Sequence, residues 1–284
     1  LLAVSLSTTD AIGHGYGMES RELHDQVLRL DVALGAFLDS LFRLRDSTRV
    51  VIALTADHGM APIPKLHFAR ERAATGAAAG AGASATVTDV PGAGGHGVDA
   101  QMGYAGVDSV LRAHNSRLAA RRIEPASQWD LESGLLTVDT AALRRARLAP
   151  DSVTDALLAD LRRVPGVLYA TRRDALPALA AGRDTTAAKY ARRWLHMLPA
   201  DLAVAGVVTL QPYWYWGGTG YATHGSPHDY DTNVPVLFWG APFRRGARVG
   251  DFARVVDMAP TLAQVLGVRP SERLDGVVLT RALR

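Results

Sequence analysis

The feature of this sequence that most constrains its fold is a set of short apolar runs that have the length of strands and lack polar alternation. Residues 50–54, 205–210 and 234–239 are almost entirely apolar. A strand with one solvated face would alternate apolar and polar residues, so these runs predict strands covered on both faces, as in a parallel sheet. Residues 1–7 have a similar composition and predict another buried strand. No leader precedes this run, which predicts that further residues come before it.

Helical periodicity separates the first two predicted strands. Apolar residues recur at spacings of four and three, the signature of a long helix with one apolar face, at Leu23, Val27, Leu30, Leu34, Phe37 and Leu41. A second helix is predicted from near Asp257 to Gly267. A strand, a helix and a strand in this order predict a right-handed crossover. The sequence therefore predicts an α/β fold with a mainly parallel central sheet.

The middle of the chain has a different character. Residues 73–97 are rich in alanine and glycine and predict a loop, because they hold too few large apolar groups to pack a core. Beyond the loop, strands at 135–138 and 167–171 and a helix at 152–163 predict a small α+β subdomain. Ser152 and Asp155 fit a capping box for that helix. We expect residues 64–203 to be inserted into a metal-binding α/β core made of residues 1–63 and 204–284.

Composition excludes some function classes. The chain has 31 Lys and Arg residues against 28 Asp and Glu residues. The Lys and Arg residues are scattered along the sequence, so no nucleic-acid-binding patch is predicted. No apolar run approaches the roughly 18 residues of a membrane helix. The oligomeric state stays open. There is no cysteine, so any metal site must use histidine and carboxylate ligands.

Three distant segments each carry histidine, aspartate or both beside glycine. They contain Asp10 with His14, Asp57 with His58, and His224. Each follows a predicted strand, and the ligand crevice of an open α/β sheet lies beyond the carboxyl ends of its strands, so we expect the segments to converge. Imidazole nitrogen and carboxylate oxygen suit zinc, and five candidate ligands indicate more than one ion.

These segments resemble the metal-ligand motifs of the alkaline phosphatase superfamily. The strings that carry the resemblance lie at residues 7–14, 55–59 and 224–227, and their order is similar to that in PafA-type bacterial monoesterases, with nucleotide pyrophosphatase/phosphodiesterases as near relatives. The resemblance implies an alkaline-phosphatase-like sandwich. It also implies two Zn²⁺ ions, or another divalent metal, with Asp10, His14 and His224 holding the first ion and Asp57 and His58 the second.

The resemblance further implies a mechanism. A small-molecule phosphate monoester would be hydrolysed by two-metal phosphoryl transfer through a covalent phospho-enzyme. The family nucleophile and the ligands that complete the second zinc site have no counterpart here, so both are expected before the first segment, and this chain alone is expected to be incomplete and nearly inactive. By resemblance the protein is expected to be periplasmic or secreted.

Alternatives remain at the level of function and of single residues. The same ions could serve a phosphodiesterase or nucleotide pyrophosphatase, and a non-catalytic metal-binding fragment is a different class. A sulfatase is disfavoured by the complete set of three ligands for the first ion. Four polar residues could hydrogen-bond to the metal ligands and orient them: Thr9, His228, Asp229 and Asp231. Alternatively, His228 could face solvent, and Asp229 and Asp231 could form an Asx-type turn. The aromatic run at residues 213–216 could flank a nucleobase, but packing is favoured.

Overall fold

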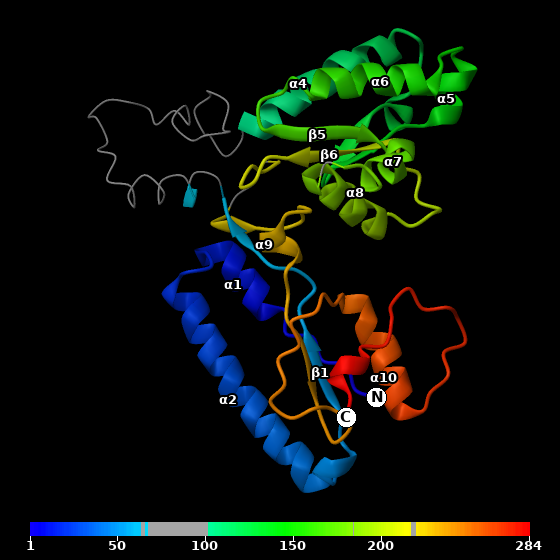
Figure 1. The fold of residues 1–284 in the computed structure, drawn as a ribbon. Coiled ribbons are helices and arrows are strands. Elements are labelled where there is room, and N and C mark those ends of the chain that lie inside the picture. The colour runs from blue at the N-terminus through cyan, green and yellow to red at the C-terminus, as the bar shows by residue number, and fades with distance from the viewer. Residues whose placement is uncertain (64–65, 68–101, 184, 217–219) are drawn as a thin grey trace. The chain divides into compact units, whose positions relative to one another are not determined.

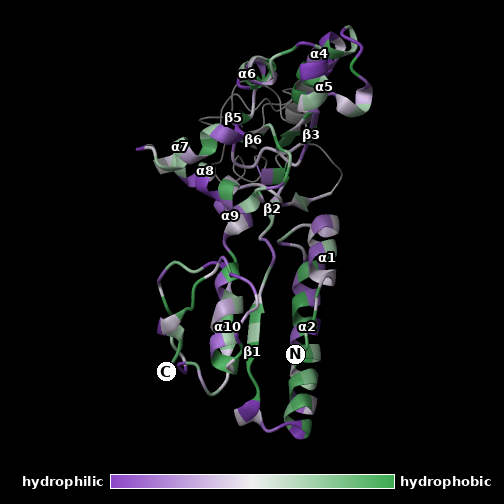
Figure 2. Ribbon diagram, turned by 90° about the vertical axis from the view of Figure 1, so that its right-hand side faces the viewer, coloured by the Kyte–Doolittle hydropathy of each residue, from purple (hydrophilic) through white to green (hydrophobic). Residues whose placement is uncertain are grey.

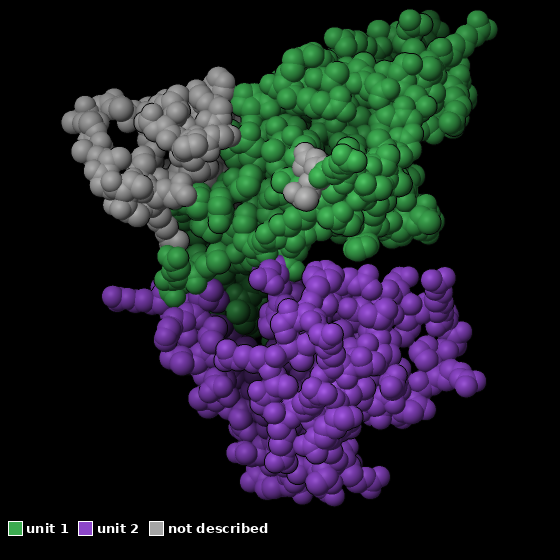
Figure 3. Space-filling model, viewed as in Figure 1, with its two compact units in different colours: residues 1–20, 60–232 green, residues 21–59, 233–284 purple. Residues whose placement is uncertain are grey.

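A computed structural model describes residues 1–63, 66–67, 102–183, 185–216 and 220–284. The predicted loop at residues 73–97 lies outside these described residues. The chain divides into two compact units (Figure 3). Unit 1 contains residues 1–20 and 60–232, and unit 2 contains residues 21–59 and 233–284.

Unit 1 is built on a four-stranded antiparallel sheet. Its strands are β3 (Asp130–Glu132), β4 (Leu135–Thr137), β5 (Val167–Arg172) and β6 (Gly206–Leu210), and their order in the sheet is β3-β4-β6-β5. Strands β4 and β5 confirm the two strands predicted for the subdomain. Strand β6 confirms the strand predicted from the apolar run at 205–210. It pairs with β4 and β5, however, and not with the other predicted core strands.

Helices cover both faces of this sheet (Figure 1). One face carries α4 (Met102–Ala119), α5 (Thr140–Arg145) and α6 (Pro150–Leu161), and the other carries α7 (Leu176–Ala180) and α8 (Thr185–Met197). Two short 3₁₀ segments also belong to unit 1, η3 (Pro125–Ser127) and η4 (Arg173–Ala175).

The alternation of side chains along β6 explains why this strand is apolar throughout. Val208 packs into the core with α4 and α6, whereas the neighbouring Val207 packs into a separate core with α8. Thr209 is also buried and accepts a hydrogen bond from the indole nitrogen of Trp194 on α8 at 2.8 Å. Because successive side chains point to opposite faces, a strand covered on both sides needs no polar alternation.

The start of α6 differs from the prediction. The helix begins at Pro150 with Ala149 as its N-cap, and no side chain caps it, so the capping box predicted at Ser152 and Asp155 is wrong. Proline is well suited to the first helical position because its missing N–H has no partner there in any helix. The helix therefore begins three residues earlier than the capping pattern indicated.

Four shorter elements of unit 1 lie around the candidate site. They are α1 (Thr8–Tyr16), β2 (Ala61–Pro62), β7 (Ala222–Thr223) and α9 (Asp229–Thr232). Strands β2 and β7 pair antiparallel. Residues 1–6 form no strand, contrary to the prediction, and their side chains are exposed. A strand needs a hydrogen-bonded neighbour, and none of the described strands pairs with this run.

Unit 2 contains α2 (Arg21–Leu44), β1 (Ile52–Thr55), β8 (Val236–Trp239) and α10 (Met258–Leu266), with the 3₁₀ segments η1 (Ser47–Arg49), η5 (Val255–Asp257) and η6 (Thr280–Ala282). Both long helices and both strands were predicted from the sequence. Hydrophobic residues recur along α2 and fill β1 (Figure 2). Helix α10 ends at Gly267, whose φ of 66° is left-handed, as expected for a C-terminal glycine.

Strand direction is where the fold prediction is not confirmed. Strand β1 pairs with β8 in antiparallel register, and the described sheets are all antiparallel, so the mainly parallel central sheet stays a prediction. The division into a core of 1–63 and 204–284 with an insertion at 64–203 also stays a prediction. Over the described part of the chain, no helix combines the length and the apolar character needed to cross a membrane.

Candidate functional site

The structure brings three of the five predicted metal ligands together within unit 1. Asp10 and His14 lie on α1, and His224 directly follows β7. Asp10 and His14 are four residues apart, and residues at this spacing share one face of a helix, so both side chains point the same way. Each of the three residues offers one ligand atom, and these atoms lie within 4.8 Å of one another.

The distances between the three ligand atoms suit a shared metal ion. Asp10 Oδ1 lies 3.5 Å from both His14 Nε2 and His224 Nε2, and the two imidazole nitrogens are 3.1 Å apart. In a tetrahedral zinc site with bonds of roughly 2.0–2.1 Å, two ligand atoms lie about 3.3 Å from each other. Two imidazoles and one carboxylate are also the donor set of known catalytic zinc sites. The residues therefore fit a zinc ion in chemistry and in spacing.

The tautomer of His14 supports this orientation. Its Nδ1 lies 2.8 Å from the backbone oxygen of Ala222. A carbonyl oxygen can only accept a hydrogen bond, so Nδ1 carries the proton and the neutral ring keeps a lone pair on Nε2, the atom that faces His224. A backbone carbonyl that fixes the ring of a histidine in this way is a common partner behind a metal ligand.

The same contact explains why α1 and β7 lie together. The backbone nitrogen of Tyr221 donates to the backbone oxygen of His14 at 2.9 Å, so His14 is bonded to this segment through both its backbone and its ring. Gly220 has a φ of 142°, and a Cβ there would lie 2.9 Å from that same oxygen. Only glycine combines this backbone conformation with the close approach of α1.

Asp57 and His58 belong to unit 2 and form a local pair there. His58 Nε2 lies 3.6 Å from Asp57 Oδ2, and its Nδ1 lies 2.8 Å from the backbone oxygen of Gly59. By the argument used for His14, Nδ1 carries the proton and Nε2 keeps the lone pair. The Asp57 side chain is largely exposed, whereas His58 is mostly buried. Their role as ligands of a second ion stays a prediction.

The loop after His224 is held by a carboxylate that is 5% exposed. Asp231 Oδ2 accepts hydrogen bonds from the backbone nitrogen and the hydroxyl of Ser226, at 2.8 and 2.6 Å. Burial raises the pKa of the Asp231 carboxyl, and the hydrogen bonds from Ser226 oppose this shift. The contact closes a turn between His224 and α9, but it is not the Asx-type turn that was one alternative, because the carboxylate accepts from a residue five positions earlier. The role of Asp231 behind a metal ligand stays a prediction.

His228 is buried. The alternative in which its side chain faces solvent is therefore wrong. Its Nε2 lies 2.9 Å from the backbone oxygen of Leu210, and its Nδ1 lies 2.9 Å from the hydroxyl of Tyr190. The carbonyl requires a proton on Nε2, so Nδ1 accepts from Tyr190. Burial lowers the pKa of His228. The side chain connects the loop after His224 with β6 and α8.

Asp229 joins the same loop to α8 through ion pairs. Its carboxylate accepts hydrogen bonds from the side chains of Lys189 and Arg193, and these bonds lower the pKa of Asp229. Arg193 also donates to the backbone oxygen of Pro227 at 2.6 Å. Thr9, the last of the predicted supporting residues, is half-buried on α1 beside Asp10. The helix that holds the loop lies in the region predicted as an insertion, and sequence periodicity offered no signal for this contact.

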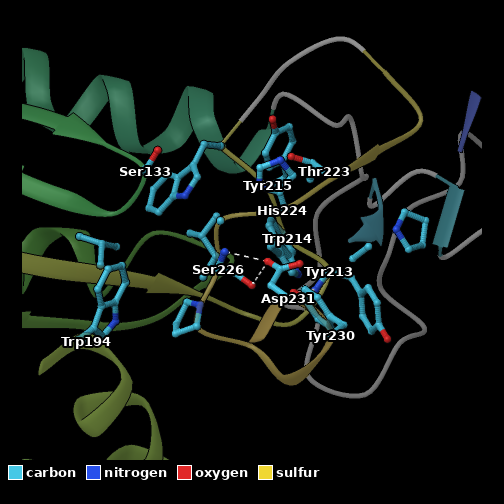
Figure 4. Close-up of a pocket in the computed structure, with 17 residues that line it drawn as sticks. Ser133, Trp194, Tyr213, Trp214, Tyr215, Thr223, His224, Ser226, Tyr230 and Asp231 are labelled. Carbon is cyan, nitrogen blue, oxygen red and sulfur yellow. Dashed lines mark hydrogen bonds between the residues drawn. The ribbon is translucent and has the colours of Figure 1, made fainter. Parts of the chain in front are cut away.

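A pocket adjoins the candidate metal site within unit 1 (Figure 4). His224 lines it together with the neighbouring residues Thr223, Gly225 and Ser226. Six aromatic side chains contribute to its wall: Trp194, Tyr213, Trp214, Tyr215, Trp216 and Tyr230. The aromatic run at 213–216 therefore serves partly for packing, as favoured from the sequence, and partly as the surface of a cavity.

Comparisons with known proteins agree with this architecture. The family model described as type I phosphodiesterase / nucleotide pyrophosphatase matches residues 1–86. Alkaline phosphatase PhoK of a Sphingomonas species is 28% identical over 97% of this chain and 45% of its own length. A calcium-transporting ATPase of Myroides odoratus is 26% identical over 94% of this chain and 43% of its own. The chain thus spans less than half the length of these relatives.

A solved structure gives the same picture for the fold. The crystal structure of wild-type alkaline phosphatase PafA superposes on this chain with a TM-score of 0.71 at 20% identity, and the match covers 98% of this chain and 47% of that one. The resemblance seen in the three motifs is thereby confirmed: the chain is similar to proteins of the alkaline phosphatase superfamily. Among those proteins, its likeness includes PafA-type alkaline phosphatases.

Proposed function

We propose that this chain carries metal ligands of a zinc-dependent phosphate monoester hydrolase. The observation that carries the proposal is the group formed by Asp10, His14 and His224, whose three ligand atoms have the mutual distances expected around one zinc ion. We assign the second zinc ion to Asp57 and His58. The substrate is proposed to be a small-molecule phosphate ester.

The ions would supply Lewis acidity, which lowers the pKa of an attacking hydroxyl and stabilises the leaving oxygen. The residues of this chain have supporting tasks. Ala222 holds the His14 ring through Nδ1, so that in the neutral ring the lone pair is on Nε2, which faces the site. Asp231 and Asp229 fix the loop that follows His224. These contacts would keep the ligands in place without rearrangement during the reaction.

In the proposed reaction a hydroxyl nucleophile attacks phosphorus, the ester P–O bond breaks and the alcohol leaves, which gives a covalent phospho-enzyme; water then hydrolyses it to inorganic phosphate and the free hydroxyl. We assign that nucleophile, and the remaining ligands of the second ion, to the part of the relatives' length that this chain does not span. A periplasmic or secreted location is proposed by analogy with the superfamily.

One alternative is supported by a specific finding. The family model that matches residues 1–86 describes type I phosphodiesterases and nucleotide pyrophosphatases, so the same ligands could serve diester or pyrophosphate cleavage. A metal-binding fragment without catalysis is the alternative from a different class.

Zinc titration of the metal-stripped chain tests the ligand assignment. We expect zinc to bind, and His224→Ala to weaken binding at that site by at least about a hundredfold, because loss of one of three protein ligands exceeds the cost of losing a supporting contact. The matched control is His196→Ala, since His196 is an exposed histidine on α8. Unchanged zinc affinity and stoichiometry in His224→Ala would remove Asp10, His14 and His224 as a zinc site.

Hydrolysis assays on the longer protein that contains this chain separate the reaction classes. Zinc-dependent cleavage of p-nitrophenyl phosphate in preference to bis-p-nitrophenyl phosphate is the expected result. The opposite preference would transfer the assignment to the phosphodiesterases. Bound zinc without cleavage of either ester would indicate a non-catalytic metal-binding protein.

A further inference from the structure

We propose that the aromatic pocket beside His224 binds an aromatic ring in the alcohol portion of the substrate, so that the preferred esters are aryl or similar aromatic phosphates. The inference rests on the proposed function, because it takes Asp10, His14 and His224 as the place where the phosphate is held. It adds a specificity site that those three residues do not provide.

The composition of the pocket wall argues for an uncharged aromatic ligand. Six of the side chains that line it are aromatic, and none of the described lining residues is lysine or arginine. A phosphate group would find no cation there, whereas the flat face of an aromatic ring can stack on tyrosine and tryptophan.

The position of the pocket connects it with the candidate metal site. His224 belongs to both, because it lines the pocket and its Nε2 lies 3.1 Å from His14 Nε2. Figure 4 shows Tyr215, Thr223 and His224 among the side chains on the pocket wall. An ester whose phosphate sits at the metal site would therefore have its alcohol portion next to the aromatic residues.

The backbone of Tyr213 gives independent support. Its φ of 62° is left-handed, a conformation that is unfavourable for a bulky residue. A hydrogen bond of 3.0 Å from its backbone nitrogen to the hydroxyl of Tyr230 holds it there, and the two rings stack with centroids 4.8 Å apart. Burial raises the pKa of Tyr230 to about 12, so its hydroxyl stays neutral. Strain of this kind persists where the surroundings impose a particular geometry, often at ligand sites.

Tyr215 is the lining aromatic that best separates binding from packing. It is half-buried and is absent from the described core clusters, whereas Trp214 and Trp216 pack against the core with α4 and α6. Replacing Tyr215 should therefore remove a stacking surface and leave the fold intact. An equivalent aromatic far from the pocket is Phe252, which is 87% exposed in unit 2.

The test measures binding of three phosphonates, which resemble the ester and resist hydrolysis, to the zinc-loaded chain by calorimetry. Phenylphosphonate should bind more tightly than methylphosphonate. Tyr215→Ala should reduce that advantage roughly three- to tenfold, the usual worth of one aromatic contact, and leave methylphosphonate affinity unchanged. Phe252→Ala should behave as the wild type. Cyclohexylphosphonate has the size of the phenyl compound without its π system, and it should bind more weakly than phenylphosphonate.

Each outcome separates the pocket from the metal site. Equal affinity for phenyl- and methylphosphonate would overturn the pocket assignment while leaving the proposed function intact. Cyclohexyl binding as tight as phenyl, or an unaltered phenyl advantage in Tyr215→Ala, would also overturn it. If no phosphonate binds, the metal site fails, and saturation-transfer NMR with phenol then decides the pocket alone. A phenol signal that is present with the wild type and disappears with Tyr215→Ala supports the pocket, and the absence of a signal with the wild type refutes it.

Discussion

Replacing His228 with glutamine should remove a pH dependence from the stability of the protein. His228 is 3% exposed, its ring is neutral with both nitrogens hydrogen-bonded, and burial lowers its pKa. The charged groups that act on its pKa are Asp229, Asp231 and Arg193, and their effects are smaller than that of burial. The unfolded chain binds a proton at this histidine with the ordinary pKa near 6.5, and the folded chain binds it less readily.

The sign and the size of the effect follow from this difference. Stability is complete above about pH 6.5 and falls as the pH drops through that value toward the lowered pKa of the folded state, because the unfolded state takes up the proton first. If the folded ring stays neutral, the loss from one histidine at pH 5.5 is about 1.4 kcal/mol. Glutamine has no proton to bind in this range, and its amide can still donate to the backbone oxygen of Leu210.

The assay is urea unfolding followed by tryptophan fluorescence at pH 7.5, 6.5 and 5.5. The free energy of unfolding of His228→Gln should change less between pH 7.5 and 5.5 than that of the wild type, by about 1.4 kcal/mol. A matched control is His24→Gln on the exposed surface of α2, which should keep the wild-type dependence. Parallel pH curves for His228→Gln and the wild type would refute the buried, neutral state of this ring.

Three further predictions concern the packing of unit 1. Leu157→Ala on α6 should lower the free energy of unfolding by about 2–5 kcal/mol in urea titration, because Leu157 is fully buried and its loss leaves a cavity. Gly166→Ala should destabilise the protein in the same assay, since φ is 87° and the added Cβ would lie 2.1 Å from the Trp214 ring; an unchanged unfolding midpoint would contradict the close packing of that ring on Gly166. Asp139→Ala should cost about 1 kcal/mol, because Asp139 caps α5 by accepting from two backbone N–H groups, and Asp139→Asn should restore most of the loss.

The sequence predicted the parts of the fold that local patterns determine. Helix α2 followed from its apolar spacing, and the strand-length runs became β1, β6 and β8. The direction in which these strands pair could not be derived, because pairing depends on which strands meet in space. Strand β6 is the clearest case. It is apolar because helices cover both faces of its sheet, and this composition is the same whether the neighbouring strands run antiparallel, as they do here, or parallel.

The candidate site shows the same limit. The motif around Asp10 and His14 identified two residues four apart, and the convergence with His224 was expected from a sheet edge. The structure brings them together differently, through backbone contact between α1 and β7. The contact of Arg193 with the loop after His224 had no sequence signal, because the two segments are far apart in the chain. For the pocket, the sequence indicated the aromatic run at residues 213–216, but not that Trp194 and Tyr230 join it.

The separation of His14 and His224 by 210 positions has a consequence for how the protein matures. Bringing two points that far apart along a chain together costs about 4–5 kcal/mol of loop-closure entropy, so the third ligand joins the first two at less cost once the intervening sheet and helices of unit 1 have formed. The amino-terminal helix alone offers only an aspartate and one histidine. A metal ion at this site would therefore bind folded unit 1 more tightly than the unfolded chain, and metal affinity would report whether α1 and β7 are in contact.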